Sequence, residues 1–337
     1  MQPNQSSAPR NYLFDNIKAL MLFFVAFGHT LDVYLASGTF EMTLMKYIYL
    51  FHMPMFAFIT GYFSKDLDKA RNGAVQKCLV PYLLFQGLYI AMANAMIAMG
   101  LASFNSDVFQ SSILLPSSAF YYLLAVFFWK LSAKDIFRFR YPVVLSLLLG
   151  LFISITSHQD FHQGLGAVFS LLFFFVLGVL CTDAAIRKIR SIPRWISVVI
   201  LIAGILPAYY LPYAIHSVRM TYQSVGFTNV EGILYRLIFY GIALIMGTAI
   251  INLVPEKKSF ISRIGEASIL VYAGSTFLAP HAYVLLARLL GLEQNRFVNM
   301  ICMTGFCLVL VFLCSLPIFV CWYRKLLQVI NRLLFKN

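Results

Sequence analysis

The chain has few charged residues and is especially poor in acidic ones. Of its 337 residues only 12% are Asp, Glu, Lys or Arg, and only 13 are Asp or Glu. Hydrophobic residues make up 61% of the chain, and 32 residues are Phe. A soluble globular domain carries about twice this charged fraction. The composition therefore excludes an ordinary soluble domain and indicates an integral membrane protein.

The sequence also lacks the motifs of several common sites. It has no Gly-x-Ser-x-Gly nucleophile motif, no Gly-rich nucleotide-binding loop, no nucleic-acid-binding module and no Cys-x-x-Cys pair. Four cysteines lie in one apolar segment, and we interpret them as packing residues: Cys302, Cys307, Cys314 and Cys321. His158, Asp160 and His162 suggest a zinc site, but solvated turn residues explain them better. We expect no metal, no retained cofactor and no nucleic-acid partner.

Ten apolar segments are long enough, or nearly so, to span a bilayer. They are residues 13–35, 44–63, 78–101, 117–133, 141–157, 163–181, 195–213, 232–252, 267–290 and 299–322. No connection between them is long enough for a separate soluble domain. We therefore predict an all-α, polytopic transmembrane domain over residues 13–322, between an N-terminal tail (1–12) and a basic C-terminal tail (323–337). No cleavage site follows the first segment, so we expect no removed signal peptide.

Basic residues alternate from loop to loop. Lys and Arg are concentrated between segments 2 and 3, 4 and 5, 6 and 7, 8 and 9, and after segment 10. The intervening loops contain only Arg219 and Arg296. By the positive-inside rule, both termini are cytoplasmic and the number of spans is even.

Two ionisable residues lie on one apolar segment, Lys18 and His29. Eleven residues of helix are three turns plus about 20°, so both side chains lie on one face, about 16 Å apart. A histidine that titrates near neutral pH, aligned with a cation that can hold phosphate at the membrane surface, suits group transfer across a bilayer. The alternative is a buried histidine bonded to a neighbouring helix, with Lys18 reaching the headgroups. Asp32 lies on nearly the same face and can orient the His29 ring, or it is an exposed helix-end carboxylate.

The second apolar segment carries His52 and Pro54. Pro54 removes a backbone donor and frees the carbonyl of Leu50, so we expect a kink that makes room for a ligand. His52 lies about 12 Å into the span, a depth at which it can approach His29. The alternative is a kinked aromatic helix with an internally bonded histidine. Two histidines at similar depth favour a polar cavity.

Four segments resemble one known family. They read Tyr12-Leu13-Phe14-Asp15-Asn16-Ile17-Lys18 leading to Gly28-His29, Phe51-His52-Met53-Pro54-Met55-Phe56, Val80-Pro81-Tyr82-Leu83-Leu84-Phe85, and Ile264-Gly265-Glu266-Ala267-Ser268-Ile269-Leu270-Val271-Tyr272. They resemble the acyltransferase 3 membrane proteins, most closely the stand-alone fucose 4-O-acetylase-like members. The resemblance implies transfer of an acyl group, commonly acetyl, from cytoplasmic acyl-CoA to a hydroxyl of a cell-envelope carbohydrate at the outer side of a bacterial cytoplasmic membrane.

The resemblance also implies roles for single residues. His29 resembles the family's essential histidine and is the candidate general base, with Asp32 beside it. Lys18 stands where the family usually has Arg and keeps the charge without the bidentate fork. The family often has an Arg before the Phe-rich stretch of the sixth helix and a His after the Tyr of the ninth. Neither is present in the segments around Gly164–Ser170 and Tyr272, although His281 lies further along the ninth helix.

Acyl transfer is consistent with the residues themselves, because a histidine can take the proton of a sugar hydroxyl as it attacks a thioester. We expect Lys18, Arg71 and Lys77 to attract the acyl-CoA phosphates, although positive loops are also expected from topology alone. Cavity or acceptor contacts are assigned to His52, Pro54, Tyr272 and His281. In the longest outer loop and at its ends, Tyr209, Tyr210, Tyr213, Tyr222, Gln223 and His216 form an interfacial belt or stack on a sugar. A transporter or flippase of an envelope lipid or saccharide is the alternative function, and a catalytically silent interaction protein is a third possibility.

Overall fold

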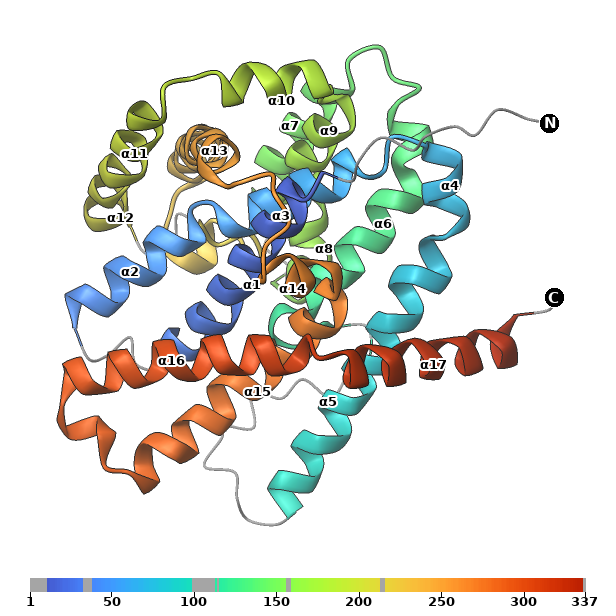
Figure 1. The fold of residues 1–337 in the computed structure, drawn as a ribbon. Coiled ribbons are helices and arrows are strands. Elements are labelled where there is room, and N and C mark those ends of the chain that lie inside the picture. The colour runs from blue at the N-terminus through green and yellow to red at the C-terminus, as the bar shows by residue number, and fades with distance from the viewer. Residues whose placement is uncertain are drawn as a thin grey trace.

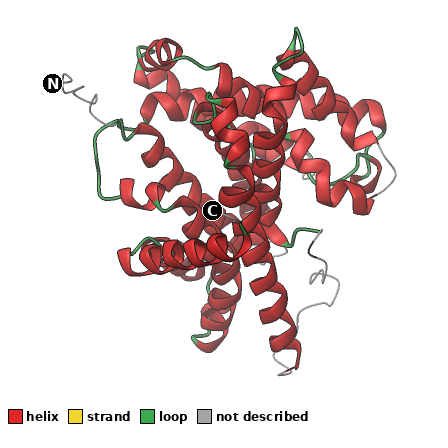
Figure 2. Cartoon of the chain, turned by 90° about the vertical axis from the view of Figure 1, so that its right-hand side faces the viewer, coloured by secondary structure: helices red, strands yellow, loops and turns green. Residues whose placement is uncertain are grey.

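The computed structural model of the protein describes residues 11–32, 38–98, 113, 115–155, 159–212 and 216–335. Within these ranges the chain is helical, with no strand (Figures 1 and 2). The first half contains α1 (Leu13–Asp32), α2 (Thr39–Tyr49), α3 (His52–Tyr62), α4 (Leu67–Asn72), the π-helical turn η2 (Val75–Leu79), α5 (Val80–Ala98), η4 (Ser118–Phe120), α6 (Tyr121–Ile136), α7 (Pro142–Phe152) and η5 (Ile153–Ile155). The second half contains α8 (Gln159–Ser170), α9 (Leu172–Leu180), α10 (Asp183–Arg190), α11 (Arg194–Ala203), α12 (Ile205–Tyr210), η7 (Gln223–Val225), α13 (Asn229–Leu253), α14 (Ser262–Glu266), α15 (Ser268–Leu289), η8 (Leu292–Gln294), α16 (Arg296–Cys314) and α17 (Pro317–Leu334).

The prediction of an all-α polytopic membrane protein is confirmed. Among the described residues, six helical segments are long and apolar enough to cross a membrane, and a seventh arises if α8–α9 and α10, bent by 97°, form one span. Two shorter apolar segments are Pro142–Ile155 and Arg194–Tyr210. Each of the ten predicted segments overlaps a helix or a run of consecutive helices. The count of ten spans and the cytoplasmic location of both termini stay predictions.

Helix α1 lies at the centre of the molecule (Figure 1). It packs against α14, α15 and α16 on one side and against α2 and α3 on another. At its first turn Asn16 donates to the carbonyls of Pro255 and Lys257, and its amide oxygen accepts from Ser259 and Ser262. These four hydrogen bonds satisfy a fully buried amide. They therefore fix the position and rotation of α1 at this end.

Helices α3 and α9 approach each other through glycines. A Cβ atom on Gly61 would lie 2.0 Å from the carbonyl oxygen of Phe175, and one on Gly178 would lie 2.0 Å from that of Phe58. Small residues at such positions let membrane helices pack by backbone contact, since no hydrophobic force drives association within lipid. This contact holds α3, and with it His52, in place.

Prolines mark two breaks in the predicted spans. Residues 39–62 form one span that is interrupted at Leu50 and Phe51, so that α3 starts at His52 with Pro54 in its first turn. The predicted tenth span, 299–322, is different: α16 ends at Cys314, and α17 begins at Pro317, which lacks the N–H needed to continue the helix. Residues 323–334, expected as a tail, therefore continue α17, which has no buried residue.

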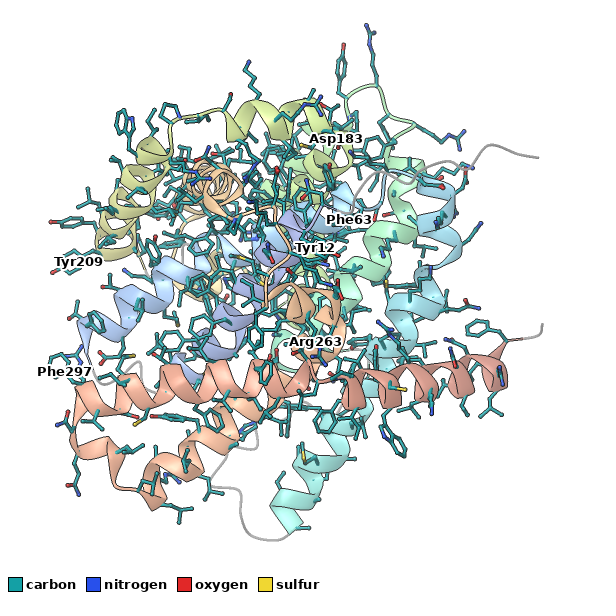
Figure 3. The ribbon with its side chains drawn as sticks, viewed as in Figure 1. Tyr12, Phe63, Asp183, Tyr209, Arg263 and Phe297 are labelled. Atoms are coloured by element: carbon teal, nitrogen blue, oxygen red, sulfur yellow. The ribbon has the colours of Figure 1, made fainter. Side chains whose placement is uncertain are left out.

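Helix ends that the charge pattern assigns to the same side lie on one edge of the molecule. Figure 3 shows Tyr209 of α12 and Phe297 of α16 at the left edge, whereas Phe63, which follows α3, lies to the right of both. Two contacts join elements on the left side. The buried Glu41 pairs with Arg296 through two bonds of 2.5 Å, and the Lys46 ammonium donates to the carbonyls of Tyr209 and Leu211.

The contact between α3 and α9 gives a test of the fold. We expect Gly178→Ala to destabilise the protein by roughly 4 kcal/mol or more, because the new methyl group forces two backbones apart. Gly241→Ala on α13 is the matched control, since a Cβ there meets nothing within 4 Å and alanine favours a helix by about 1 kcal/mol. Thermal unfolding in detergent measures both. A Gly178→Ala variant as stable as Gly241→Ala would contradict this packing.

Candidate functional site

The site is built around Tyr49, the last residue of α2. Its ring centroid lies 6.3 Å from that of His29, 4.8 Å from that of His52 and 4.9 Å from that of His216. We call His29, His52 and His216 the histidine cluster. Its members come from α1, α3 and the loop after α12, so segments far apart in the sequence meet at one tyrosine.

Gly28 explains why Tyr49 can stand so close to α1. A Cβ atom at Gly28 would lie 2.8 Å from Cε1 of Tyr49, which is closer than such atoms approach each other. The residue before His29 therefore has to lack a side chain. The Gly28-His29 pair places an aromatic ring against the helix next to the candidate base.

His52 has a defined tautomer. Its Nδ1 lies 3.0 Å from the carbonyl oxygen of Ile48, and a carbonyl can only accept, so Nδ1 carries the proton. In the neutral ring Nε2 is then unprotonated and can accept a hydrogen bond. The His52 side chain is buried, 4% exposed, whereas His29 keeps partial exposure. His52 thus offers a fixed hydrogen-bond acceptor, and His29 offers an imidazole that a ligand can reach.

The loop between α12 and α13 contributes two further groups, His216 and Arg219. Burial, followed by the charges of Lys46 and Arg236, lowers the pKa of His216 to about 3, so this ring is neutral at physiological pH. The Arg219 guanidinium is close enough to act electrostatically on His29. It donates a 2.8 Å hydrogen bond to the carbonyl of Pro116 and stands over the Tyr121 ring, 5.0 Å from its centroid.

A cavity of about 280 Å³ lies between α1, α3, η2, α6 and α15. Three cations line it: Lys18, Lys77 and Lys130. Each lies near a helix end that the charge pattern predicts to be cytoplasmic. Lys18 pairs with Asp15 at 2.8 Å. Lys77 and Lys130 have no ion pair within 4.0 Å with a carboxylate among the described residues. The ammonium groups can therefore hold a polyanion, for which a lysine acts as a point charge.

Tyr272 connects the cavity with the histidine cluster. It lines the cavity together with Phe56 and Tyr122, whose ring centroids lie 6.2 Å and 5.6 Å from its own. It is also within electrostatic range of Tyr49 and Arg219. Its hydroxyl donates to the carbonyl of Ala119 and is thereby held in place. A molecule in the cavity thus reaches, at Tyr272, the neighbourhood of the histidines.

The structure brings together some of the residues predicted as a site. Lys18, Lys77 and Tyr272 line the cavity, and His29 and His52 flank Tyr49. The buried Pro54 lies two residues before the cavity residue Phe56 in α3 and does not itself line the cavity.

Other predicted residues lie elsewhere. Arg71 pairs with Asp135 at 3.3 Å and is not among the cavity residues. Asp32 is the exposed last residue of α1. His281 packs on Phe277 at 5.1 Å, about 13 Å along α15 from Tyr272.

Sequence reasoning assigned no site role to Tyr49, Lys130 or Arg219. Lys130 begins the run of basic residues that the charge pattern places between segments 4 and 5, with Lys134, Arg138 and Arg140, although it is still within α6. Arg219 did carry a signal, because it is one of two basic residues in loops predicted to be extracytoplasmic. A cation that departs from the positive-inside pattern is a better site candidate than one that follows it.

The described residues contain no group of three or more His, Cys, Asp or Glu side chains that could hold a metal ion. Tyr49 stands among the three rings of the histidine cluster and keeps them apart. The segment with Asp160 and His162 is helical in α8, while His158 lies outside the described residues. Of the predicted outer aromatic residues, Tyr213 also lies outside them. Tyr222 is buried, and Tyr209 and Tyr210 are exposed.

Comparison with known proteins gives one match. A family model described as an acyltransferase domain, that of the acyltransferase 3 family, matches residues 11–323. No curated protein and no solved structure matches the chain. The model covers almost all of the 337 residues, including α1, the cavity and the histidine cluster. The protein therefore belongs to the acyltransferase 3 family and is a membrane acyltransferase.

Proposed function

We propose that the protein is an O-acyltransferase that moves an acyl group, acetyl in the first instance, from cytoplasmic acyl-CoA to a hydroxyl of an extracytoplasmic envelope carbohydrate. The observation that carries this proposal is the cavity, which is lined by three lysines near predicted cytoplasmic helix ends and also by Tyr272 and by Phe56, one turn beyond His52 in α3. Coenzyme A has its phosphates at one end and its thioester at the other. A bound acyl-CoA with its phosphates on the lysines would direct its thioester towards His29.

In the proposed reaction His29 is the general base. The imidazole takes the proton of the acceptor hydroxyl while that oxygen attacks the thioester carbonyl carbon. The carbonyl electron pair moves onto oxygen, and the tetrahedral intermediate then collapses with cleavage of the carbon–sulfur bond. The imidazolium returns its proton to the departing thiolate. No covalent enzyme intermediate is required, and acyl-CoA is consumed as a substrate.

His52 fits a positioning role in this reaction. With Nδ1–H bonded to the carbonyl of Ile48, its Nε2 can accept from a second hydroxyl of the acceptor. Tyr49 lies next to both rings and presents an aromatic face on which a sugar can stack. These contacts support a carbohydrate acceptor. The fucose 4-O-acetylase-like subgroup and the bacterial cytoplasmic membrane remain part of the proposal on the strength of the sequence resemblance.

His29→Ala tests the general base. We expect kcat for acetyl transfer to fall about 100- to 10,000-fold, because no base is then positioned to take the proton of the acceptor hydroxyl. Transfer of radiolabelled acetyl groups to an envelope-glycan extract by protein in liposomes measures it. Thr248→Ala is the control for removing a polar side chain from a span, since this hydroxyl is on the exposed face of α13. Equal labelling by wild type and His29→Ala would remove His29 from the mechanism. If the wild type labels nothing with any acyl donor but moves the saccharide across the membrane, the protein is a transporter.

Lys130→Ala tests the donor site. We expect KM for acetyl-CoA to rise about 10- to 100-fold with a smaller change in kcat, because a charge-assisted contact to phosphate contributes about 1.5–3 kcal/mol. Lys134→Ala, one turn further along α6, is the matched control. Its ammonium pairs with the exposed Asp68 and does not line the cavity. Steady-state kinetics at saturating acceptor distinguishes the two variants. Equal KM values for Lys130→Ala and Lys134→Ala would place the coenzyme elsewhere.

A further inference from the structure

Acyl transfer of the proposed kind creates a negative charge that His29 does not stabilise. The charge develops on the thioester carbonyl oxygen, while His29 handles only the proton. A fixed cation or pair of N–H donors at this oxygen is the usual way in which enzymes lower such a barrier. The lysines of the cavity are too distant for this task, since Lys18 lies about 16 Å from His29 along α1.

Arg219 lies close to the histidine cluster, three residues after His216 in the loop between α12 and α13. The His216 ring centroid is 4.9 Å from that of Tyr49, which is 6.3 Å from that of His29. The Arg219 charge acts on His29 as well as on Tyr82, Tyr121 and Tyr272. Tyr272 lines the cavity, and Tyr121, over whose ring Arg219 stands, precedes the cavity residue Tyr122 in α6. The guanidinium therefore lies near both the histidine cluster and residues of the donor cavity.

The turn at residues 116–121 holds Arg219 and Tyr272 together. Arg219 donates to the carbonyl of Pro116, at the start of this turn, and covers the ring of Tyr121, at its end. Tyr272 donates to the carbonyl of Ala119 in between. One short segment thus sets the position of the cation relative to the tyrosine at the inner end of the cavity.

This turn is itself fixed by the buried Gln86 of α5. The Gln86 amide nitrogen donates to the carbonyl of Leu115 and to the hydroxyl of Ser117, and its oxygen accepts from the backbone N–H of Ser117. A guanidinium has five N–H donors in a rigid fork. The bond to Pro116 and the contact with the Tyr121 ring hold this fork in a preorganised frame, which is the condition for electrostatic stabilisation without reorganisation during the reaction.

We propose that the Arg219 guanidinium stabilises the oxyanion that forms on the thioester carbonyl during acyl transfer. This role rests on the proposed function. As the acceptor oxygen bonds to the carbonyl carbon and its proton moves to His29, the carbonyl electron pair moves onto oxygen beside Arg219. When the pair returns, the carbon–sulfur bond breaks and the thiolate leaves with the proton from His29. Arg219 itself neither gains nor loses a proton.

The first experiment compares Arg219→Gln, Arg219→Lys and wild type in the liposome assay. We expect kcat of Arg219→Gln to fall about 100- to 1000-fold, with KM for acetyl-CoA within about threefold of wild type, because the phosphates bind the lysines. Arg219→Lys keeps the charge without the fork and recovers part of kcat. Arg288→Gln, at the exposed end of α15, is the control for loss of an arginine from the side predicted to be extracytoplasmic. A kcat of Arg219→Gln within threefold of wild type would overturn the proposal.

A second measurement separates this role from a purely structural one, in which Arg219 only ties its loop to Pro116. Ethylguanidinium is added to Arg219→Ala, and activity and unfolding temperature are recorded. If ethylguanidinium restores kcat and the unfolding temperature is unchanged, the result supports a guanidinium that acts at the reacting carbonyl group. A lowered unfolding temperature without rescue would show a structural tie and overturn the proposal. Inactive wild type would reject the proposed function itself, whereas active wild type with an equally active Arg219→Gln would reject only the role of Arg219.

Discussion

The rotation of α1 about its own axis is the constraint on which the rest of the site depends. The hydrogen bonds of the Asn16 amide fix this rotation at the first turn, and the contact between Gly28 and Tyr49 fixes it again at the last turns. Close packing reinforces the first of these contacts, since a Cβ on Gly265 would sit 1.9 Å from the carbonyl oxygen of Asp15, the residue before Asn16. Because Lys18 and His29 share one face, a turned helix would move both from the cavity and the histidine cluster together.

The two halves of the site are built in different ways. The donor half is a cavity lined by lysines, whose point-like charges on flexible stems adapt to a polyphosphate. Around the histidine cluster the polar groups are instead tied to backbone carbonyls: His52 to Ile48, Lys46 to Tyr209 and Leu211, and Arg219 to Pro116. A membrane interior offers few other acceptors, so fixed positions follow from the need to satisfy buried polar groups.

Sequence reasoning identified the all-α membrane fold and the residues that helical periodicity can relate. Lys18 and His29 lie on one helix, and His52 follows from depth counting on the next, so spacing was sufficient. Arg219 and His216 come from the connection between α12 and α13, and their positions depend on packing against α2, α13 and the turn at residues 116–121. Spacing also did not distinguish Lys77, which lines the cavity, from Arg71, whose partner Asp135 lies 64 residues away. The end of α16 was misplaced because the apolar composition continues past Pro317 into an amphipathic helix.

The partners of Asn16 have a consequence for how the protein is made. Ser262 follows Asn16 by 246 residues, and a ribosome that adds about 5–20 residues per second needs roughly 12–50 s to synthesise that interval. During this time α1 has entered the membrane without the segment that satisfies its amide. Although α1 precedes the other described helices, it is therefore among the last to reach its final packing. A nascent chain that stops before α14 has an α1 whose Asn16 amide lacks its bond to Ser262. Quality control that recognises unsatisfied polar groups in a membrane span would act on this interval.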